Sequence, residues 1–290
     1  MRIREILSIL LLLAVPAAAQ TDVNGLVVLL TDYGADSVYV GALKGAIYAK
    51  YPDARIDSLT NSVPAFDIMS GAFLLAEWCD AFPKGTTFCC VVDPGVGTER
   101  RVIAMKTESG HLFVAPDNGL LTLVADRLGV VEVREGENRA LWRNFLVSAT
   151  FHGRDIFGPI AASLAGGVPL DKLGSVVTDM VRLDIPKSEV NGETVKGAVI
   201  RIDRYGNIVT NITRPDLAAI GLQAGDSLDI SIGNATFTAP LKRQYRDVGE
   251  GERLALFQSS GYLECAVNLG SLADALGEEL RAPVTVRKAK

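Results

Sequence analysis

The sequence predicts an α/β protein in which an N-terminal, helix-covered and mainly parallel sheet is followed by a smaller antiparallel β domain of the barrel or sandwich type. From about residue 25 to residue 167, short apolar runs rich in β-formers alternate with longer helical segments, an order typical of a parallel sheet covered by helices. After about residue 186, short alternating runs follow one another with only turn residues between them, as in antiparallel β domains. We therefore expect the first domain over 22–186 and the second over 193–290.

The elements of both domains follow from the length of each apolar run and from the residues that end it. Residues 26–30 are continuously apolar and predict a buried strand, and residues 37–50 predict a helix that ends before Pro52. The other elements expected in the first domain are strands over 56–59 and 87–92, a helix over 67–81, a hairpin of 102–106 and 112–115, and a helix over 120–127. In the second domain the runs predict strands over 195–202, 208–212, 227–232, 236–239, 254–257, 262–267 and 284–286.

The first 19 residues have the composition of a secretory signal peptide. Arg2 and Arg4 precede an apolar run over 6–15, and Pro16 with the alanines at 17–19 forms a small-residue cleavage site. The apolar run is roughly ten residues long, about half of what a membrane-spanning helix needs. We therefore expect residues 1–19 to be removed and the mature protein to be exported, periplasmic or secreted, with no membrane anchor after cleavage.

The composition narrows the classes of partner. The net charge is −5, the isoelectric point is near 5.2 and lysine and arginine form no cluster, so a nucleic-acid partner is not expected. A small molecule is the expected ligand. The chain has only two histidines and no C-x-x-C pair, so we do not expect a metal site, and no cofactor is expected either.

Four cysteines, at positions 79, 89, 90 and 265, lie in the exported part, where disulfides are chemically possible. Cys89 and Cys90 are neighbours in an apolar strand, so their side chains should point to opposite faces of the sheet. Two interpretations stay open. Either all four cysteines are small buried apolar residues, or Cys79 and Cys89 form a disulfide.

Polar residues that directly follow the predicted strands are the first candidates for a site, because ligands of open α/β sheets bind beyond the carboxyl ends of the strands. Three loops qualify, and they carry Asp32, the pair Asp93 and Arg100, and His152. Structural roles stay open for each loop: a helix cap at the first, an ion pair that shapes the second, and a capping histidine in the third. The other histidine, His111, falls in the predicted hairpin turn and is expected to be exposed.

Five strings contain or flank these loops and occur in order along the chain: TDYG (31–34), VDPGVGTERR (92–101), APDNGLL (115–121), FHGRDIF (151–157) and DRYGNIVTNI (203–212). Together they resemble the family of S-adenosylmethionine hydroxide adenosyltransferases, the water-using relatives of the fluorinating and chlorinating enzymes. The resemblance implies hydrolysis of S-adenosylmethionine to adenosine and methionine. It also implies a homotrimer in which the nucleoside lies between the α/β domain of one subunit and the β domain of its neighbour.

The resemblance places Asp93, Arg100 and His152 around the attacking water. The sulfonium already makes methionine a good leaving group, so the protein has to place a water in line with C5′ and help to remove its proton. Asp93 or His152 can accept that proton, while Arg100 can stabilise hydroxide-like charge. We expect Arg100 to keep Asp93 as a carboxylate, which favours His152 as the acceptor.

The resemblance also implies seven residues around the rest of the substrate: Asp32 for the ribose hydroxyls, Phe66 near the sugar, Asn207 and Tyr245 for adenine, Asp203 for the methionine ammonium, and Ser259 with Ser260 for its carboxylate. Ser260 departs from the pattern, because the halogenases have an arginine there.

Three rival functions stay open beside hydrolysis. The halogenases carry a tyrosine and a serine where this chain has His152 and Gly153, and a carboxylate at Asp93 would repel a halide, so a halogenase is disfavoured. A second rival is an exported protein that binds adenosine or S-adenosylmethionine without turnover, since the supply of this substrate outside the cytoplasm is unclear. A third is hydrolysis of a different 5′-substituted adenosine.

Overall fold

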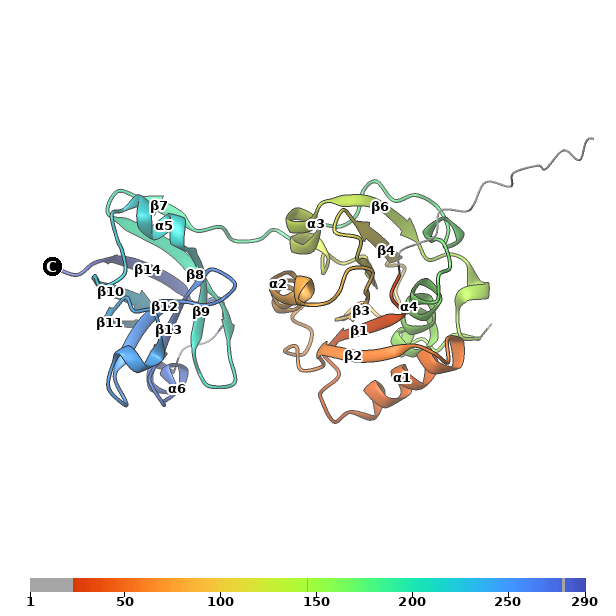
Figure 1. The fold of residues 1–290 in the computed structure, drawn as a ribbon, viewed down its shortest axis with the longest axis horizontal. Helices are drawn as coiled ribbons and strands as arrows, with labels where there is room; N and C mark the ends of the chain where they lie inside the picture. The colour runs from red at the N-terminus through yellow and green to blue at the C-terminus, as the bar shows by residue number, and fades with distance from the viewer. Residues whose placement is uncertain (1–22, 145, 278–279) are drawn as a thin grey trace, which may run out of the picture.

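The computed structural model describes residues 23–144, 146–277 and 280–290. The expected signal peptide, residues 1–19, lies outside the described residues. The described chain forms two domains that lie side by side and are joined by an extended segment (Figure 1). Within those residues no helix is long and apolar enough to span a membrane.

The first domain is built on one six-stranded sheet. Its strands are β1 (Leu26–Thr31), β2 (Arg55–Thr60), β3 (Thr87–Val91), β4 (Val102–Thr107), β5 (Leu112–Pro116) and β6 (Val130–Glu135), in the order β2-β1-β3-β5-β4-β6. The pairs β1–β2, β1–β3 and β3–β5 are parallel, whereas β4 runs antiparallel to both β5 and β6. The expected helix-covered, mainly parallel sheet is therefore present, with an antiparallel edge to which the unpredicted strand β6 belongs.

Helices cover both faces of this sheet (Figure 1). They are α1 (Val38–Lys50), α2 (Ile68–Trp78), α3 (Thr122–Leu128) and α4 (Gly158–Ala165). Ser37 caps α1 by accepting a hydrogen bond from the N–H of Tyr39, and Asp67 caps α2 in the same way through the N–H of Ser70. The helix expected over 67–81 thus begins after its cap, and its last turn, Cys79–Ala81, is a 3₁₀ turn.

The two faces of the sheet bury two separate apolar cores. Successive residues along a strand point to opposite faces of the sheet and so belong to different cores. Cys89 packs on the face covered by α1 and α4, and Cys90 packs on the face covered by α2 and α3. This confirms the opposite orientation expected for the two residues. All four cysteines are buried, and none of them forms a disulfide.

His111 is not exposed as expected. Its exposed fraction is only 4%, and its ring lies 5.5 Å from that of Phe88 in an edge-on arrangement. The reason is its position at the base of the hairpin, where its carbonyl accepts the N–H of Thr107 and closes the turn over the core. Its Nδ1 is buried and has no hydrogen-bond partner.

The second domain is an antiparallel sheet that curls almost into a barrel. Its strands are β7 (Glu189–Asn191), β8 (Thr194–Ile202), β9 (Ile208–Thr213), β10 (Ser227–Ile232), β11 (Ala235–Pro240), β12 (Arg253–Phe257), β13 (Tyr262–Val267) and β14 (Pro283–Lys288). The order is β11-β10-β14-β8-β9-β13-β12, with β7 paired to β8. A bridge between Leu241 and Ala255 brings the two outer strands together around the main apolar core of this domain. Two short helices, α5 (Arg214–Ala219) and α6 (Leu272–Leu276), lie against this sheet.

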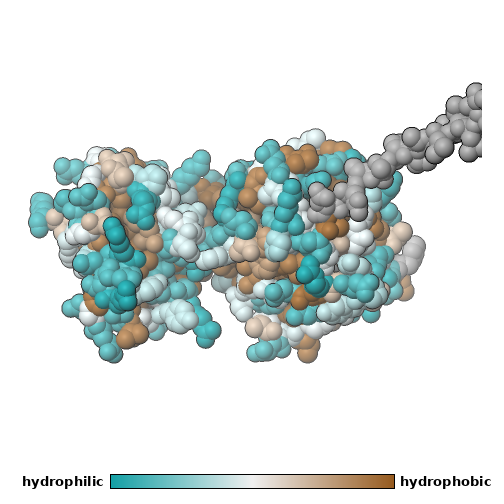
Figure 2. All heavy atoms as spheres, viewed as in Figure 1, coloured by the Kyte–Doolittle hydropathy of each residue, from teal (hydrophilic) through white to brown (hydrophobic). Residues whose placement is uncertain are grey.

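The domains meet where α2 of the first faces β8 and β9 of the second (Figure 1). Phe73 packs there with Ile200 and Val209. Two ion pairs flank this contact, Arg281 with Asp67 at 2.7 Å and Arg201 with Glu77 at 3.3 Å. On the face seen in Figure 2, polar and apolar residues are interspersed over both domains.

Candidate active site

The loops singled out in the sequence gather at one edge of the first sheet. Asp32 directly follows β1, and Asp93 lies two residues after the end of β3. Arg100 lies two residues before β4. His152 directly precedes a π-helical turn, Gly153–Phe157, that leads into α4. The carboxyl ends of parallel strands form the usual ligand-binding edge of such a sheet, and π-turns are frequent at functional sites.

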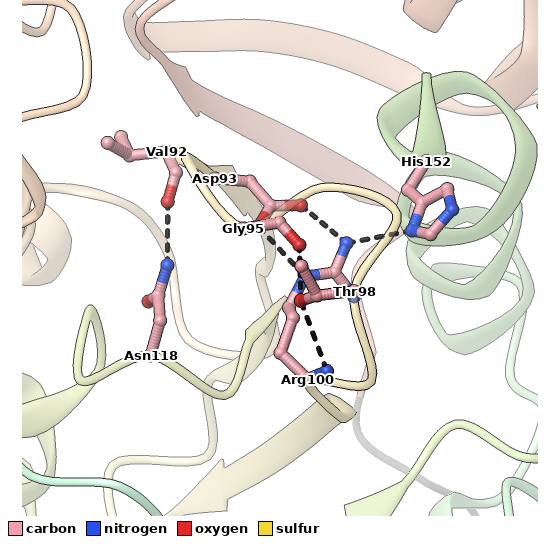
Figure 3. A network of polar contacts seen from close by, with 7 residues as sticks. All are labelled: Val92, Asp93, Gly95, Thr98, Arg100, Asn118 and His152. Carbon is pink, nitrogen blue, oxygen red and sulfur yellow. Dashed lines mark hydrogen bonds and ion pairs between the residues drawn. The ribbon is translucent and has the colours of Figure 1, made fainter. Parts of the chain in front are cut away.

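Arg100 connects Asp93 and His152 in one polar network (Figure 3). Its Nε donates to Asp93 Oδ1 at 2.8 Å, and its Nη2 donates to Asp93 Oδ2 at 2.5 Å. The same Nη2 lies 2.8 Å from Nδ1 of His152. The side chains of Arg100 and Asp93 are only 10% and 5% exposed, so this bidentate pair is held largely away from water.

The network fixes the protonation of His152. A guanidinium carries only donors, so Nδ1 of His152 must accept the hydrogen bond from Arg100 and the remaining ring proton must sit on Nε2. Burial, reinforced by the charge of Arg100, lowers the pKa of His152, and the carboxylates of Asp93 and Asp155 oppose this only in part. His152 is therefore a neutral imidazole near pH 7.

The backbone around the network is tightly packed. Gly97 has a φ of +82°, and a Cβ on it would overlap the carbonyl oxygen of Ala149. Glycine at this position therefore lets the 93–100 loop pack closely against the segment that precedes His152. Thr98 closes the loop by donating from its hydroxyl to the carbonyl of Gly95 at 2.7 Å. Asn118 donates to the carbonyl of Val92 at 2.9 Å and so holds the end of β3 (Figure 3).

A hollow of about 400 Å³ lies in front of this network. Four of the predicted site residues line it, namely Asp32, Phe66, Asp93 and His152, whereas Arg100 stands behind Asp93. Asp32 accepts the backbone N–H of Phe66 at 3.0 Å. This contact supports Phe66 in a left-handed conformation, φ +65°, and the residue is 71% exposed.

A second hollow, of about 550 Å³, lies in the other domain and collects three more predicted residues: Asp203, Asn207 and Tyr245. Asp203 accepts the side-chain N–H of Asn207 at 2.9 Å, and the Tyr245 hydroxyl donates to Glu264 at 2.5 Å. Burial raises the pKa of Glu264.

The sequence did not identify the other residues that line this hollow, among them Tyr205 and Leu269. Leu269 is 82% exposed with a φ of +57°, so an apolar side chain is held out of the fold in a strained conformation. The string over residues 203–212, which contains Tyr205, pointed to this part of the chain. The exposure of Leu269 cannot be predicted from a single sequence, because leucine is usually buried.

The two predicted serines lie elsewhere in this chain. Ser259 is exposed in the turn between β12 and β13. Ser260 lines a third hollow, of about 370 Å³, between the two domains, together with Glu77 and Tyr262. The structure therefore brings Asp93, Arg100 and His152 together, but it divides the predicted substrate residues of one chain among separate places. In the described ranges no group of three His, Cys, Asp or Glu side chains is placed to hold a metal.

Fold and site together define a two-domain protein with an α/β domain, a nearly closed antiparallel β domain, and an Asp–Arg–His network beside a ligand-sized hollow. The chain belongs to the S-adenosylmethionine hydroxide adenosyltransferase family, whose N-terminal domain matches residues 27–174 and whose C-terminal domain matches residues 197–285.

Named relatives and a solved structure agree with this membership. An (R)-S-adenosyl-L-methionine hydrolase from Salinispora arenicola is 38% identical over 257 residues, which cover 87% of this chain and 95% of that protein. A fluorinase from an Actinoplanes species is 30% identical, over 92% of this chain and 98% of its own. A crystal structure of an uncharacterised conserved protein from Thermotoga maritima is 39% identical and has a TM-score of 0.87, with 90% of this chain and 99% of that chain covered.

Proposed function

We propose that this protein hydrolyses S-adenosylmethionine to adenosine and methionine, with Asp93, Arg100 and His152 acting on the water. The observation that carries the proposal is the shared guanidinium nitrogen of Arg100, which holds a carboxylate and a neutral imidazole at the wall of one hollow. Membership of the family and its hydrolase relatives support the same activity. No metal or cofactor has a part in this proposal.

The reaction needs one water and releases one proton. The water oxygen forms a bond to C5′ while the C5′–S bond breaks, and the electron pair of that bond stays on the sulfur of methionine. The sequence led us to expect His152 as the proton acceptor, but its Nδ1 already accepts from Arg100, so we propose Asp93 as the acceptor instead. The positive charge of Arg100 then stabilises the developing hydroxide from behind Asp93, and His152 holds Nη2 of Arg100 in place through Nδ1.

We propose that the active site is completed by a neighbouring subunit in a homotrimer. Asp32 and Phe66 line a hollow of the first domain, while Asn207 and Tyr245 line another in the second domain. Each hollow carries an exposed apolar side chain, Phe66 in one and Leu269 in the other, which contact with a nucleoside or a second subunit would cover. The roles proposed for the residues of the two hollows follow this pairing: Asp32 and Phe66 for ribose, Asn207 and Tyr245 for adenine, and Asp203 for the methionine ammonium. Ser259 and Ser260 lie outside both hollows, and their proposed role at the methionine carboxylate rests on the family resemblance alone.

A mixing experiment tests the shared site. Asp93→Ala disables the first-domain half and Asn207→Ala the second-domain half. Subunits of the two inactive variants, unfolded together and refolded, should regain part of the activity, because some interfaces then combine two intact halves. Either variant refolded alone is the control, and a mixture as inactive as its components contradicts the proposal.

We further propose that residues 1–19 direct export and that the mature protein is periplasmic or secreted. The charged start, the short apolar run and the alanine-rich end support this proposal. Fractionation of cells that express the full chain tests it, with N-terminal sequencing of the recovered protein. An uncleaved chain confined to the cytoplasm would contradict export.

Product analysis tests the proposed reaction. The purified mature protein is incubated with each sulfonium epimer of S-adenosylmethionine, with and without added chloride or fluoride, and the products are separated by chromatography. Halide-independent adenosine and methionine in equal amounts are expected. Bound but unchanged substrate would indicate a binding protein, and a halide-dependent 5′-halo nucleoside would indicate a halogenase.

A further inference from the structure

Tyr33 is packed directly against Gly153 at the wall of the hollow that Asp93 and His152 line. A Cβ placed on Gly153 would overlap the hydroxyl oxygen of Tyr33 and would lie 3.2 Å from its Cζ. Gly153 is helical rather than left-handed, so backbone conformation does not require glycine there. The hydroxyl of Tyr33 thus fills the space that a side chain at position 153 would occupy.

Neighbouring aromatic residues hold the ring of Tyr33 in this position. Its centroid lies 5.8 Å from that of Phe151 and 6.0 Å from that of Tyr39, and Phe151 meets Tyr39 edge-on at 5.0 Å. The three rings form one cluster that restrains the ring of Tyr33, so the hydroxyl is placed by packing. In the described part of the chain, no hydrogen bond engages this hydroxyl, which leaves both its donor and its lone pairs available to a molecule in the hollow.

The hydroxyl also stays protonated. Burial raises the pKa of Tyr33 far above its ordinary value, and the nearby Cys89, Asp32 and Asp93 add to the effect. A phenol that keeps its proton is a hydrogen-bond donor at every working pH. It faces the same hollow as Asp93, and so it is available to the water that Asp93 deprotonates.

We infer that the Tyr33 hydroxyl holds the attacking water by a hydrogen bond. We also infer that this hydroxyl favours water as the nucleophile, because it fills the space beside Gly153 that another side chain would otherwise occupy. The inference deepens the proposed hydrolysis and rests on it. In the reaction, Tyr33 donates its O–H to one lone pair of the water, and a second lone pair forms the bond to C5′. The water's proton passes to Asp93 and then to solvent, so Tyr33 is unchanged at the end of the turnover.

The assignment also explains the residue pair at positions 33 and 153. A serine at position 153 would overlap the hydroxyl of Tyr33 from its Cβ outward, so the two groups exclude each other. In this chain the hydroxyl donor beside Gly153 is therefore supplied by Tyr33 and not by a side chain at position 153.

Kinetics of Tyr33→Phe test the hydroxyl, because the substitution removes one oxygen and keeps the packed ring. We expect kcat for adenosine formation to fall about 100-fold while KM changes little, since a donor to the developing hydroxide is lost and substrate contacts remain. Tyr48→Phe, the same chemical change on the outer face of α1, is the control. An unchanged kcat in Tyr33→Phe, with wild-type melting temperature, would overturn the inference.

A second measurement is independent of activity. Gly153→Ser should lower the melting temperature strongly in the wild-type chain but much less in Tyr33→Phe, because the overlapping oxygen is then absent and the remaining contacts need only small shifts. Additive effects of the two substitutions would overturn the proposed exclusion. A wild-type chain that leaves S-adenosylmethionine intact would refute the proposed function instead, and the stability cycle would still decide the relation between positions 33 and 153.

Discussion

Nη2 of Arg100 lies 2.8 Å from Nδ1 of His152, and this contact determines what the histidine can do. Arginine cannot accept a hydrogen bond, so the imidazole lone pair is already used and the ring presents only its Nε2–H. The same guanidinium also donates hydrogen bonds to Asp93 from two nitrogens. The network therefore contains one base with free lone pairs, Asp93, and two donors.

Asp93→Asn should lower kcat about 1,000-fold, because it removes the proton acceptor while keeping nearly the same shape. Substrate binding should persist, since Asp93 is not proposed to hold the adenine or the methionine. Asp179→Asn is the matched control, because Asp179 pairs with the neighbouring Arg101 but its side chain is 78% exposed. Steady-state kinetics with both variants check this, and an Asp93→Asn enzyme with normal kcat would exclude the carboxylate as the base.

Activity should fall on the acid side as His152 takes up a proton. Protonation removes the acceptor at Nδ1 and sets a cation against Arg100. Because burial and Arg100 lower the pKa of His152 below its ordinary value of 6.5, the acid limb of kcat/KM should lie below that pH. In His152→Asn, whose side chain does not titrate, this limb should disappear along with most of the activity, and a persisting limb would assign the titration to another group.

His111 should make folding stability depend on pH. Burial lowers the pKa of His111, so the unfolded chain binds a proton at pH values where the folded chain does not. The stability contributed by the neutral ring is complete above the ordinary value of 6.5 and is lost as the pH falls below it. Urea unfolding at about pH 7.5 and about pH 5.5 should show a smaller loss in His111→Phe than in the wild-type chain, and equal losses would contradict the assignment.

The buried pair of Glu77 and Arg201 should couple the two domains. The Glu77 side chain is almost fully buried, and its Oε1 and the Nε of Arg201 have no partners. Arg201→Met should destabilise the protein by about 3 kcal/mol, because it leaves the Glu77 carboxylate buried without a counter-charge, whereas Glu77→Leu combined with Arg201→Met should recover most of the loss. A double-mutant cycle measured by denaturant unfolding checks this, and additive losses would show that the pair is not coupled.

Local sequence patterns predicted most of the first domain. The strand expected over 26–30 is β1, Leu26–Thr31, and the helix expected over 37–50 begins one residue later because Ser37 is its cap. Strand β6, Val130–Glu135, escaped prediction because it is an edge strand whose first two valines are exposed, so it lacks the apolar run of a buried strand.

The candidate site also has features that the sequence predicted and others that only the structure reveals. The loops after β1 and β3 and before α4 were visible as polar residues that follow or precede apolar runs. The contact of Arg100 with His152 joins residues 52 positions apart, and the overlap of Tyr33 with a side chain at Gly153 depends on ring packing, so only the fold reveals them. His111 was misjudged because a turn position predicts exposure, whereas the hairpin folds its base onto the core.

The most direct test of the proposed hydrolysis follows the oxygen atom. The protein is incubated with S-adenosylmethionine in water enriched in a heavy oxygen isotope, and the adenosine formed is analysed by mass spectrometry with fragmentation. We expect one heavy oxygen, on the 5′-hydroxyl of adenosine and absent from methionine, and no such product from Asp93→Asn in the same time. Adenosine without the label, or labelled adenosine formed equally fast by Asp93→Asn, would contradict attack by a water held at Asp93, Arg100 and His152.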